Sequence, residues 1–235
     1  CGNVALKYGI DAIVSSENAE LIVCVDHGLL KKKIVQSKYN CAFELSFSEA
    51  LKHYEFDAVY IATPTAFHKE VALEAAERGI HILCEKSLAS NFVDAEEMIN
   101  AAYENDVALF EGFMYQFHLQ HAFVKRLLAE EKIGEVYQIN AHFSYPARPK
   151  GDFRYNKRKG GGGLLDAGAY PVHLARMFFR DEPIRIKSSL YENKSVDIRG
   201  SILMTFKDNR VAQLNYAMNS FYKNKYELFG SNGVI

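Results

Sequence analysis

The sequence lacks several features that would assign it to a specialised class of protein. No apolar run approaches the roughly 18 residues that a membrane-spanning helix needs. Lysine and arginine total 28 against 29 acidic residues, and the formal net charge of -1 creates no overall field for nucleic acid or an anionic membrane. The basic run at 157–159 is too short to change this. We therefore expect neither nucleic acid nor a membrane as a partner.

Cysteine is scarce and widely spaced. The four cysteines contain no pair close enough in sequence for a zinc knuckle, and the eight histidines form no cluster with ligand spacing. A chain of 235 residues is too large to need disulfide staples. We therefore expect no metal site, and free thiols in a reducing cytoplasm at Cys1, Cys24, Cys41 and Cys84.

Neither end of the sequence has the pattern of a natural domain boundary. The chain begins in a glycine-containing turn at Cys1, and it ends at Ile235 inside a strand-like pattern. We expect the intact protein to extend beyond both ends, with a first strand before Cys1.

The first half of the chain alternates between strand-like and helical patterns. Apolar runs at 21–25, 57–62, 80–84 and 107–110 are separated by segments with helical spacing. This alternation predicts a Rossmann-type doubly wound parallel sheet over residues 1–112. Glu85 and Lys86 follow the third of these runs, and ligands bind at the carboxyl ends of the strands in such sheets.

The first turn resembles part of a dinucleotide-binding fingerprint. Gly2-Asn3-Val4-Ala5 supplies the second half of G-x-G-x-x-G/A, and Asp26 follows Gly2 by 24 positions, near the spacing at which an acid reaches the adenosine ribose. An acid there accepts the 2′-hydroxyl of NAD, whereas His27 and the lysines at 31–33 are suited to the 2′-phosphate of NADP. We keep both cofactors, with a lean to NAD; a plain αβ unit with a solvated Asp26 is the alternative.

The second half has a different pattern. Residues alternate in character over 136–145, and further strand-like runs occupy 184–192, 201–206, 211–217 and 226–229. The dipeptide Asp208-Asn209 between two of these runs indicates a hairpin turn. We predict an α+β domain over residues 113–235 with a mostly antiparallel open sheet, which binds substrate and forms dimers.

A glycine run at 160–163 precedes a helical segment that carries three chemically useful side chains. Glycine costs about 1 kcal/mol relative to alanine in regular structure, so we interpret the run as allowing tight turning and close approach of a ligand. Asp166, Tyr170 and His173 follow at i, i+4 and i+7, which places them on one helix face if Pro171 causes only a mild kink. The alternative is a capping Asp, a packed Tyr and a core His.

A lysine and a tyrosine together are suited to moving a proton during hydride transfer. The ammonium of Lys86 near Tyr170 would lower the phenol pKa and allow Tyr170 to take a proton from a substrate hydroxyl. Glu85 would orient Lys86 or support the cofactor ribose, and the Thr63-Pro64-Thr65 turn would line the cofactor cleft.

These motifs together resemble the glucose–fructose oxidoreductase / inositol dehydrogenase family (the GFO/IDH/MocA type). The resemblance rests on Thr63-Pro64 with His68, on Glu85-Lys86, and on the glycine run with Asp166 and Tyr170. Tyr170 makes the chain most similar to the dihydrodiol and D-xylose dehydrogenase branch. The resemblance implies an NAD(P)-dependent oxidoreductase that acts on a hydroxyl or carbonyl of a sugar, cyclitol or vicinal diol and forms a homodimer or larger homo-oligomer.

The resemblance also implies roles for individual residues. Lys86, Tyr170 and Asp166 are the expected catalytic residues. The expected cofactor contacts are Gly2, Asn3, Val4, Asp26, His27, Thr63, Pro64, Thr65, His68, Glu85 and Lys86. The expected substrate contacts are Phe113, Gln116, Arg154 and His173.

The sequence departs from the family pattern at a few positions, and two other functions stay open. Ser87 replaces the proline of E-K-P, and Gln116 and Leu119 replace Arg and Pro of the Y-R-F-H-P run, which puts substrate contacts in that segment in doubt. One alternative is an NAD-dependent glycosidase that recycles its cofactor in place. The other is a non-catalytic NAD(P) sensor, which the presence of both Lys86 and Tyr170 disfavours.

Overall fold

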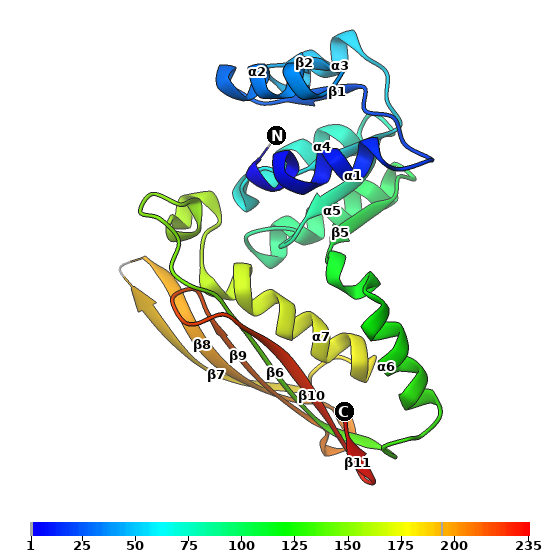
Figure 1. The fold of residues 1–235 in the computed structure, drawn as a ribbon, viewed down its shortest axis with the longest axis vertical. Helices are drawn as coiled ribbons and strands as arrows, with labels where there is room; N and C mark the ends of the chain where they lie inside the picture. Colours follow the sequence, from blue (N-terminus) through cyan, green and yellow to red (C-terminus); the bar gives the residue numbers. More distant parts are fainter. Residues whose placement is uncertain (1, 194) are drawn as a thin grey trace. The chain divides into compact units, whose positions relative to one another are not determined.

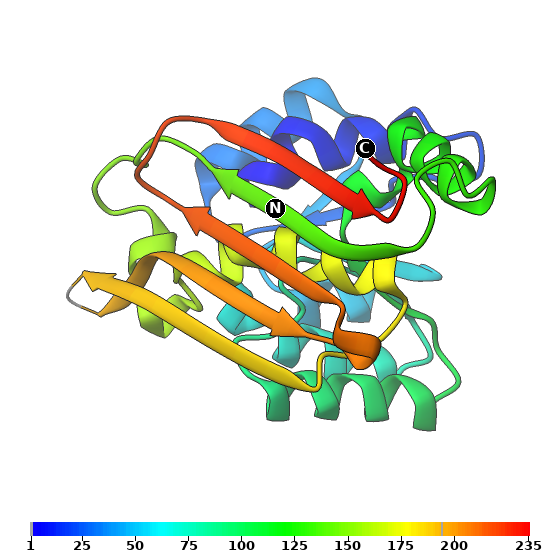
Figure 2. The same ribbon diagram turned by 90° about the horizontal axis from the view of Figure 1, so that it is seen from below.

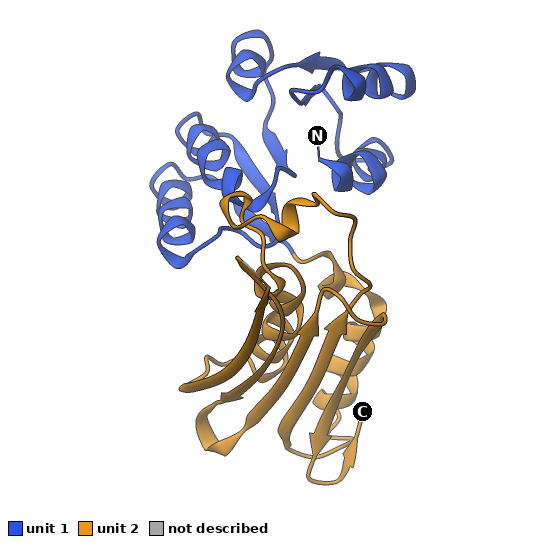
Figure 3. Ribbon diagram, turned by 90° about the vertical axis from the view of Figure 1, so that its left-hand side faces the viewer, with its two compact units in different colours: residues 1–112 blue, residues 113–235 orange. Residues whose placement is uncertain are grey.

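The computed structural model describes residues 2–193 and 195–235. The chain divides after Gly112 into two compact units, Cys1–Gly112 and Phe113–Ile235 (Figure 3). In the described part of the chain, no helix is long and apolar enough to cross a bilayer.

Unit 1 is built around parallel strands joined by helices (Figure 1). β3 (Ala58–Ile61), β4 (His81–Glu85) and β5 (Leu109–Gly112) form a parallel sheet with β4 in the middle, and β1 (Val23–Val25) pairs in parallel with β2 (Ala42–Glu44). The helices are Ala5–Gly9 (π-type) running into α1 (Ile10–Val14), α2 (Leu29–Lys38), α3 (Phe47–His53), α4 (His68–Ala76) and α5 (Phe92–Glu104). The predicted parallel αβ architecture is confirmed.

Short-range chemistry fixes the ends of the unit 1 helices. The Ser46 hydroxyl and the Asn91 side chain accept hydrogen bonds from backbone N–H groups at the starts of α3 and α5. Gly79 follows α4 with a φ of 72°, a left-handed conformation that glycine adopts without strain. The core between α4, α5 and the sheet uses small side chains on α4, namely Ala72, Ala75 and Ala76, against Ile61, Ile82, Cys84 and Met98.

Unit 2 is an open six-stranded sheet with one long helix on its inner face (Figure 1, Figure 2). The strands are β6 (Val136–Ser144), β7 (Arg185–Asn193), β8 (Val196–Thr205), β9 (Val211–Ala217), β10 (Lys223–Gly230) and β11 (Gly233–Val234), in the order β11-β10-β6-β9-β8-β7. Only the β6–β9 pair is parallel, so the prediction of a mostly antiparallel sheet is confirmed. α7 (Ala169–Phe179) packs on β6 and β9, and α6 (Leu119–Ala129) precedes β6.

Some elements differ from the sequence interpretation. β2 was not predicted, because its three residues give no readable alternation. The sequence pattern places a helix over 123–131, and α6 begins four residues earlier. β8 begins five residues before the predicted 201. Pro171 lies inside a continuous helical segment, because the π-helical turn Leu164–Gly168 runs directly into α7 with Gly168 and Ala169 both in the right-handed helical conformation.

Candidate active site

In unit 1, the carboxyl end of β4 presents Glu85 and Lys86 as the sequence predicts. The Tyr60 hydroxyl on the neighbouring strand donates to Glu85 Oε1 at 2.6 Å. The Glu111 carboxylate on β5 accepts from the Leu88 N–H at 2.8 Å, just beyond Lys86. Side chains from both neighbouring strands thus fix the turn that carries Lys86.

His68 ties this turn to the end of β3. Its ring is 1% exposed; Nδ1 lies 3.1 Å from the carbonyl oxygens of both Ser87 and Leu88, and Nε2 lies 2.9 Å from the carbonyl oxygen of Thr63. The sequence predicted His68 as a cofactor contact, whereas both ring nitrogens are engaged with backbone. We expect His68 to act by holding two loops together.

The residues predicted to bind the cofactor lie at strand ends and helix starts of unit 1. A Cβ atom on Gly2 would fall 2.1 Å from the carbonyl oxygen of Ala62, so only glycine fits there. The hydroxyl of Thr63 is buried and has no hydrogen-bond partner among the described residues, which fits a site that a ligand group completes. Pro64 and Thr65 open the short helix that follows, Asn3 and Val4 begin the first helix, and His27 is exposed after β1.

Asp26 is the acid that the fingerprint spacing predicted. Its carboxylate accepts from the Gly28 N–H at 2.8 Å and from Lys31 Nζ at 2.7 Å. Burial opposes ionisation of Asp26, but the bonds from Lys31 and Gly28 outweigh it and lower its pKa. The ionised acid and a lysine therefore stand together at the end of β1.

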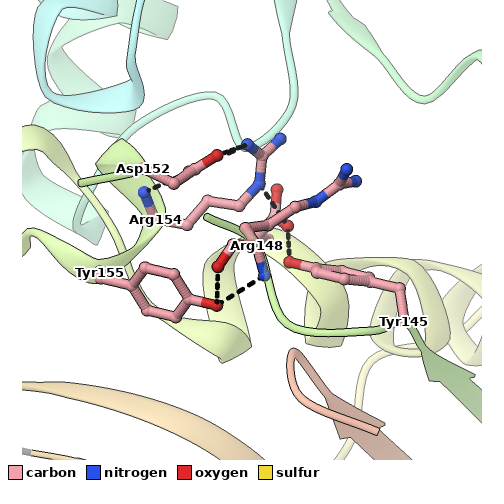
Figure 4. A network of polar contacts seen from close by, with 6 residues as sticks. Tyr145, Arg148, Asp152, Arg154 and Tyr155 are labelled. Atoms are coloured by element: carbon pink, nitrogen blue, oxygen red, sulfur yellow. Dashed lines mark hydrogen bonds and ion pairs between the residues drawn. The ribbon is translucent and has the colours of Figure 1, made fainter. Parts of the chain in front are cut away.

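In unit 2, the carboxylate of Asp166 joins a polar network with Tyr145 and Arg154, two of the residues labelled in Figure 4. Its carboxylate accepts from the Tyr145 hydroxyl and from Arg154 Nε, the latter at 2.8 Å. Arg154 also pairs with Asp152 at 3.3 Å, and its interactions with the two carboxylates raise its pKa despite burial. Arg154, predicted as a substrate contact, thus holds Asp166, and Tyr145 was not predicted at all.

Tyr170 lies in a group of aromatic rings at the start of α7. Its ring makes edge contacts with Phe143, Tyr115 and Phe113 at centroid distances of 4.9, 5.7 and 5.9 Å. His173 stacks on Phe113 at 4.1 Å and shares a 2.7 Å hydrogen bond with the Tyr115 hydroxyl.

Burial sets the charge state of this group. It lowers the pKa of His173 to about 4, so the imidazole is neutral at neutral pH, and it raises the pKa of Tyr115. The structure brings together Phe113, Tyr170 and His173, three residues that the sequence predicted for the site. Gln116 lies in the adjoining short helix, where its N–H donates to the Phe113 carbonyl.

Protein atoms occupy the space beside the glycine run. A Cβ on Gly162, which has a φ of 140°, would fall 2.7 Å from Asp197 Oδ1, and one on Gly161 would fall 2.5 Å from the Arg154 carbonyl oxygen. Asp197 Oδ2 accepts from the Leu164 N–H and from the Tyr216 hydroxyl, both at 2.6 Å. In the structure, the close approach that Gly161 and Gly162 allow is to backbone and Asp197. The close approach of a ligand stays a prediction.

Two family models match nearly the whole chain. The model described as "Oxidoreductase family, NAD-binding Rossmann fold" matches residues 1–113. The model described as "GFO/IDH/MocA C-terminal domain" matches residues 121–235.

Curated relatives match the chain along most or all of its length. A dTDP-3,4-didehydro-2,6-dideoxy-alpha-D-glucose 3-reductase from Saccharopolyspora spinosa is 30% identical over 100% of this chain and 71% of its own length. A trans-1,2-dihydrobenzene-1,2-diol dehydrogenase from Xenopus tropicalis is 32% identical over 81% of this chain and 58% of its own.

Solved structures share the fold. A 3-ketoreductase from Actinomadura kijaniata in complex with NADP and TDP-benzene superposes with a TM-score of 0.92 at 30% identity, covering 100% of this chain and 73% of its own. A myo-inositol 2-dehydrogenase from Lactobacillus plantarum superposes with a TM-score of 0.90 at 18% identity, a likeness of fold alone.

Proposed function

Because the chain belongs to the oxidoreductase family that joins an NAD-binding Rossmann domain to a GFO/IDH/MocA C-terminal domain, we propose that it reduces a keto group of a sugar at the expense of a nicotinamide cofactor, and oxidises the corresponding alcohol in reverse. The relatives that span the whole chain include sugar 3-reductases, which supports a ketosugar over a cyclitol or a simple diol.

The observation that carries this proposal is the setting of Tyr170. Three aromatic rings fix its ring at the start of α7, four residues after Asp166. The Asp197 carboxylate holds the preceding turn by accepting from the Leu164 N–H. A phenol fixed in this way is a proton donor to a substrate carbonyl oxygen.

The roles follow from the chemistry of each group. The nicotinamide, when bound, supplies the hydride to the carbonyl carbon. Tyr170 gives a proton to the oxygen of that carbonyl. Lys86, just after the carboxyl end of β4, contributes a positive charge on the side of the unit that binds the cofactor. Asp166, held by Tyr145 and Arg154, fixes the start of the helix that carries Tyr170.

The cofactor would be held by the unit 1 residues named above. Gly2 allows the first helix to approach the end of β3, the Thr63 hydroxyl offers an unused hydrogen bond, and Asp26 with Lys31 meets the adenosine ribose. The Asp26–Lys31 pair supports use of NADP as well as NAD, because the lysine can bind a 2′-phosphate that the acid alone would repel.

The test is absorbance-monitored turnover of the intact protein. NADPH and NADH would be offered with a panel of free and nucleotide-linked ketosugars, and NADP and NAD with the matching alcohols. Stoichiometric oxidation or reduction of the nicotinamide supports the proposal. Tight cofactor binding with no net change in nicotinamide for any substrate contradicts it and favours the cofactor-recycling glycosidase or the sensor.

The outer face of the unit 2 sheet supports a homodimer. This face carries residues such as Leu203, Gln213 and Asn215, which alternate along the strands with buried residues of the core under α7. An antiparallel sheet commonly packs one face on the core and leaves the other exposed, so this outer face is open to a partner. We propose that a second copy of the chain covers this one.

A further inference from the structure

The segment that precedes the glycine run in unit 2 holds a local excess of positive charge. Residues 146–160 carry a single carboxylate, Asp152, against six cations: Arg148, Lys150, Arg154, Lys157, Arg158 and Lys159. The whole chain has a net charge of -1, so the excess is specific to this segment.

Most of these cations have no carboxylate partner. Asp152 and Asp166 are both engaged by Arg154. Within residues 2–193 and 195–235, the structure records no ion pair for the other five cations, and all five are exposed. Cations that only solubilise a surface need no fixed position, so the question is whether any of the five is held in place.

Arg148 is held in place, and it is held beside Asp166. Its N–H donates to the Tyr155 hydroxyl at 2.9 Å, and its guanidinium lies over the Tyr145 ring, 5.0 Å from the centroid. The hydroxyl of that same Tyr145 donates to Asp166 (Figure 4). Prolines at 146 and 149 restrict the backbone on both sides.

The positive charge of Arg148 acts on the buried Tyr145 hydroxyl. Burial and the Asp166 carboxylate raise the pKa of Tyr145, and the charges of Arg154 and Arg148 act against that rise. Arg148 therefore lies close to the group that holds Asp166, while its own guanidinium N–H groups remain available to a ligand.

We propose that Arg148, supported by Lys150 and the cations at 157–159, binds the phosphate groups of a nucleoside-diphosphate-linked substrate. A guanidinium fixed on an aromatic ring presents its N–H groups as a planar fork, which matches phosphate oxygens in two-point hydrogen bonding. The exposed lysines around it add attraction for a doubly charged diphosphate.

The inference rests on the proposed function and deepens it, because it names the nucleotide part of the substrate that the site recognises. It makes Arg148 a specificity-determining residue rather than a participant in hydride transfer. Replacing Arg148 should then weaken binding of the substrate without changing the rate of the chemical step.

The experiment uses thymidine diphosphate and inorganic pyrophosphate as probes. Binding to the intact protein would be measured by titration calorimetry with and without saturating NADP, for the wild type and for Arg148→Gln. The matched control is Arg199→Gln, since Arg199 is also exposed and also lies over a tyrosine ring, 4.1 Å from the Tyr191 centroid, but on β8 outside this segment. Thermal unfolding of each variant would establish that it is folded.

We expect Arg148→Gln to weaken thymidine diphosphate binding about tenfold or more, because a charge-assisted hydrogen bond is lost, and Arg199→Gln to leave it unchanged. Three results would overturn the inference: no binding of either probe to the wild type at millimolar concentration, equal losses in the two variants, or a matching loss of NADP affinity, which would assign the segment to the cofactor phosphate.

The binding measurement does not depend on turnover, so the two proposals fail separately. Arg148-dependent binding of thymidine diphosphate with no hydride transfer to any substrate keeps this inference and rejects the proposed function. Hydride transfer to free ketosugars without any diphosphate binding does the reverse.

Discussion

At the scale of single residues, the residues predicted for the site are of two kinds. Some have a chemistry of their own, and others hold neighbouring groups in place. Tyr170 and Lys86 are assigned to the first kind. Tyr145, Arg154 and His68 belong to the second, since their polar atoms are bonded to Asp166 or to the backbone beside Lys86.

The roles of Tyr170 and Lys86 can be tested by conservative truncation. Tyr170→Phe should lower kcat by roughly 10²–10⁴-fold, the usual contribution of a general acid or base, and Lys86→Ala should abolish turnover. Tyr137→Phe, at an exposed tyrosine on β6, is the control. Steady-state kinetics near the wild-type level in Tyr170→Phe would reduce Tyr170 to a packing residue.

His173 gives a prediction for acid stability. Its folded pKa of about 4 lies below the ordinary 6.5, so the unfolded chain binds more protons between these pH values. The free energy of unfolding should therefore fall as the pH drops from 6.5 to 4, and the fall should be shallower in His173→Gln. Urea unfolding at several pH values measures both slopes, and parallel slopes would show that His173 titrates normally.

Lys31 should influence the choice of cofactor. It pairs with Asp26 at 2.7 Å, so its removal leaves the acid uncompensated where a 2′-phosphate would lie. Lys31→Ala should raise KM for NADP about tenfold and leave KM for NAD nearly unchanged, with the neighbouring Lys33→Ala as the control. An equal rise in KM for NADP and for NAD would show that Lys31 does not contact the 2′-phosphate.

At the scale of elements, the first helical turn before α7 depends on a residue that lies far from it in sequence. Asp197 on β8 accepts from the N–H of Leu164 and from the hydroxyl of the buried Tyr216. The glycines at 162 and 163 leave room for this carboxylate.

Truncation of Asp197 should therefore cost more than truncation of its partner. Asp197→Ala leaves the Leu164 N–H and the Tyr216 hydroxyl without their acceptor and should lower the free energy of unfolding by about 2–4 kcal/mol. Tyr216→Phe removes only one bond and should cost about 1 kcal/mol. Urea unfolding of the two single variants and the double variant measures both costs and their coupling; strict additivity would contradict a direct interaction.

The elements themselves were largely predictable from sequence. The apolar run before Glu85 gave the central strand β4, and the alternation over 136–145 gave β6, because both signals are periodic and local. The contacts around Asp166 were not predictable, since Tyr145, Arg154 and Asp197 come from three separate segments. The inward pattern of Ile139, Ala141 and Phe143 could have indicated that Tyr145 also points into the core.

At the scale of the whole molecule, the two units have separate cores, and each unit is assigned a separate binding role. Unit 1 carries the residues assigned to the cofactor, and unit 2 carries those assigned to the substrate. The sequence indicated this division through the change from parallel-type to alternating patterns near Gly112. The sequence did not show which polar groups in each unit have protein partners, so the contacts of His68 and Arg154 with backbone and carboxylates could not be read from it. Their predicted ligand-binding roles stay predictions.

The proposed dimer can be tested on the outer face of the unit 2 sheet. Leu203→Lys places a charge on that face and should shift the intact protein toward monomer, because a buried unpaired charge weakens an interface strongly. Lys125→Glu, at an exposed residue of α6, is a control for surface charge in general. Light scattering coupled to gel filtration reports the masses, and a monomeric wild type would reject the dimer.

The packing around the glycine run has a consequence for how enzymes of this kind change over generations. Backbone, Asp197 and Tyr216 occupy the space that side chains at 161–163 would need. Random substitutions there should mostly be lost as unfolded variants. The neighbouring exposed segment around Arg148 can accept change without that penalty. A lineage could therefore acquire new substrates through this segment while its glycine run stayed the same, and a laboratory library that seeks new substrates should vary residues 146–151 and leave the glycines alone.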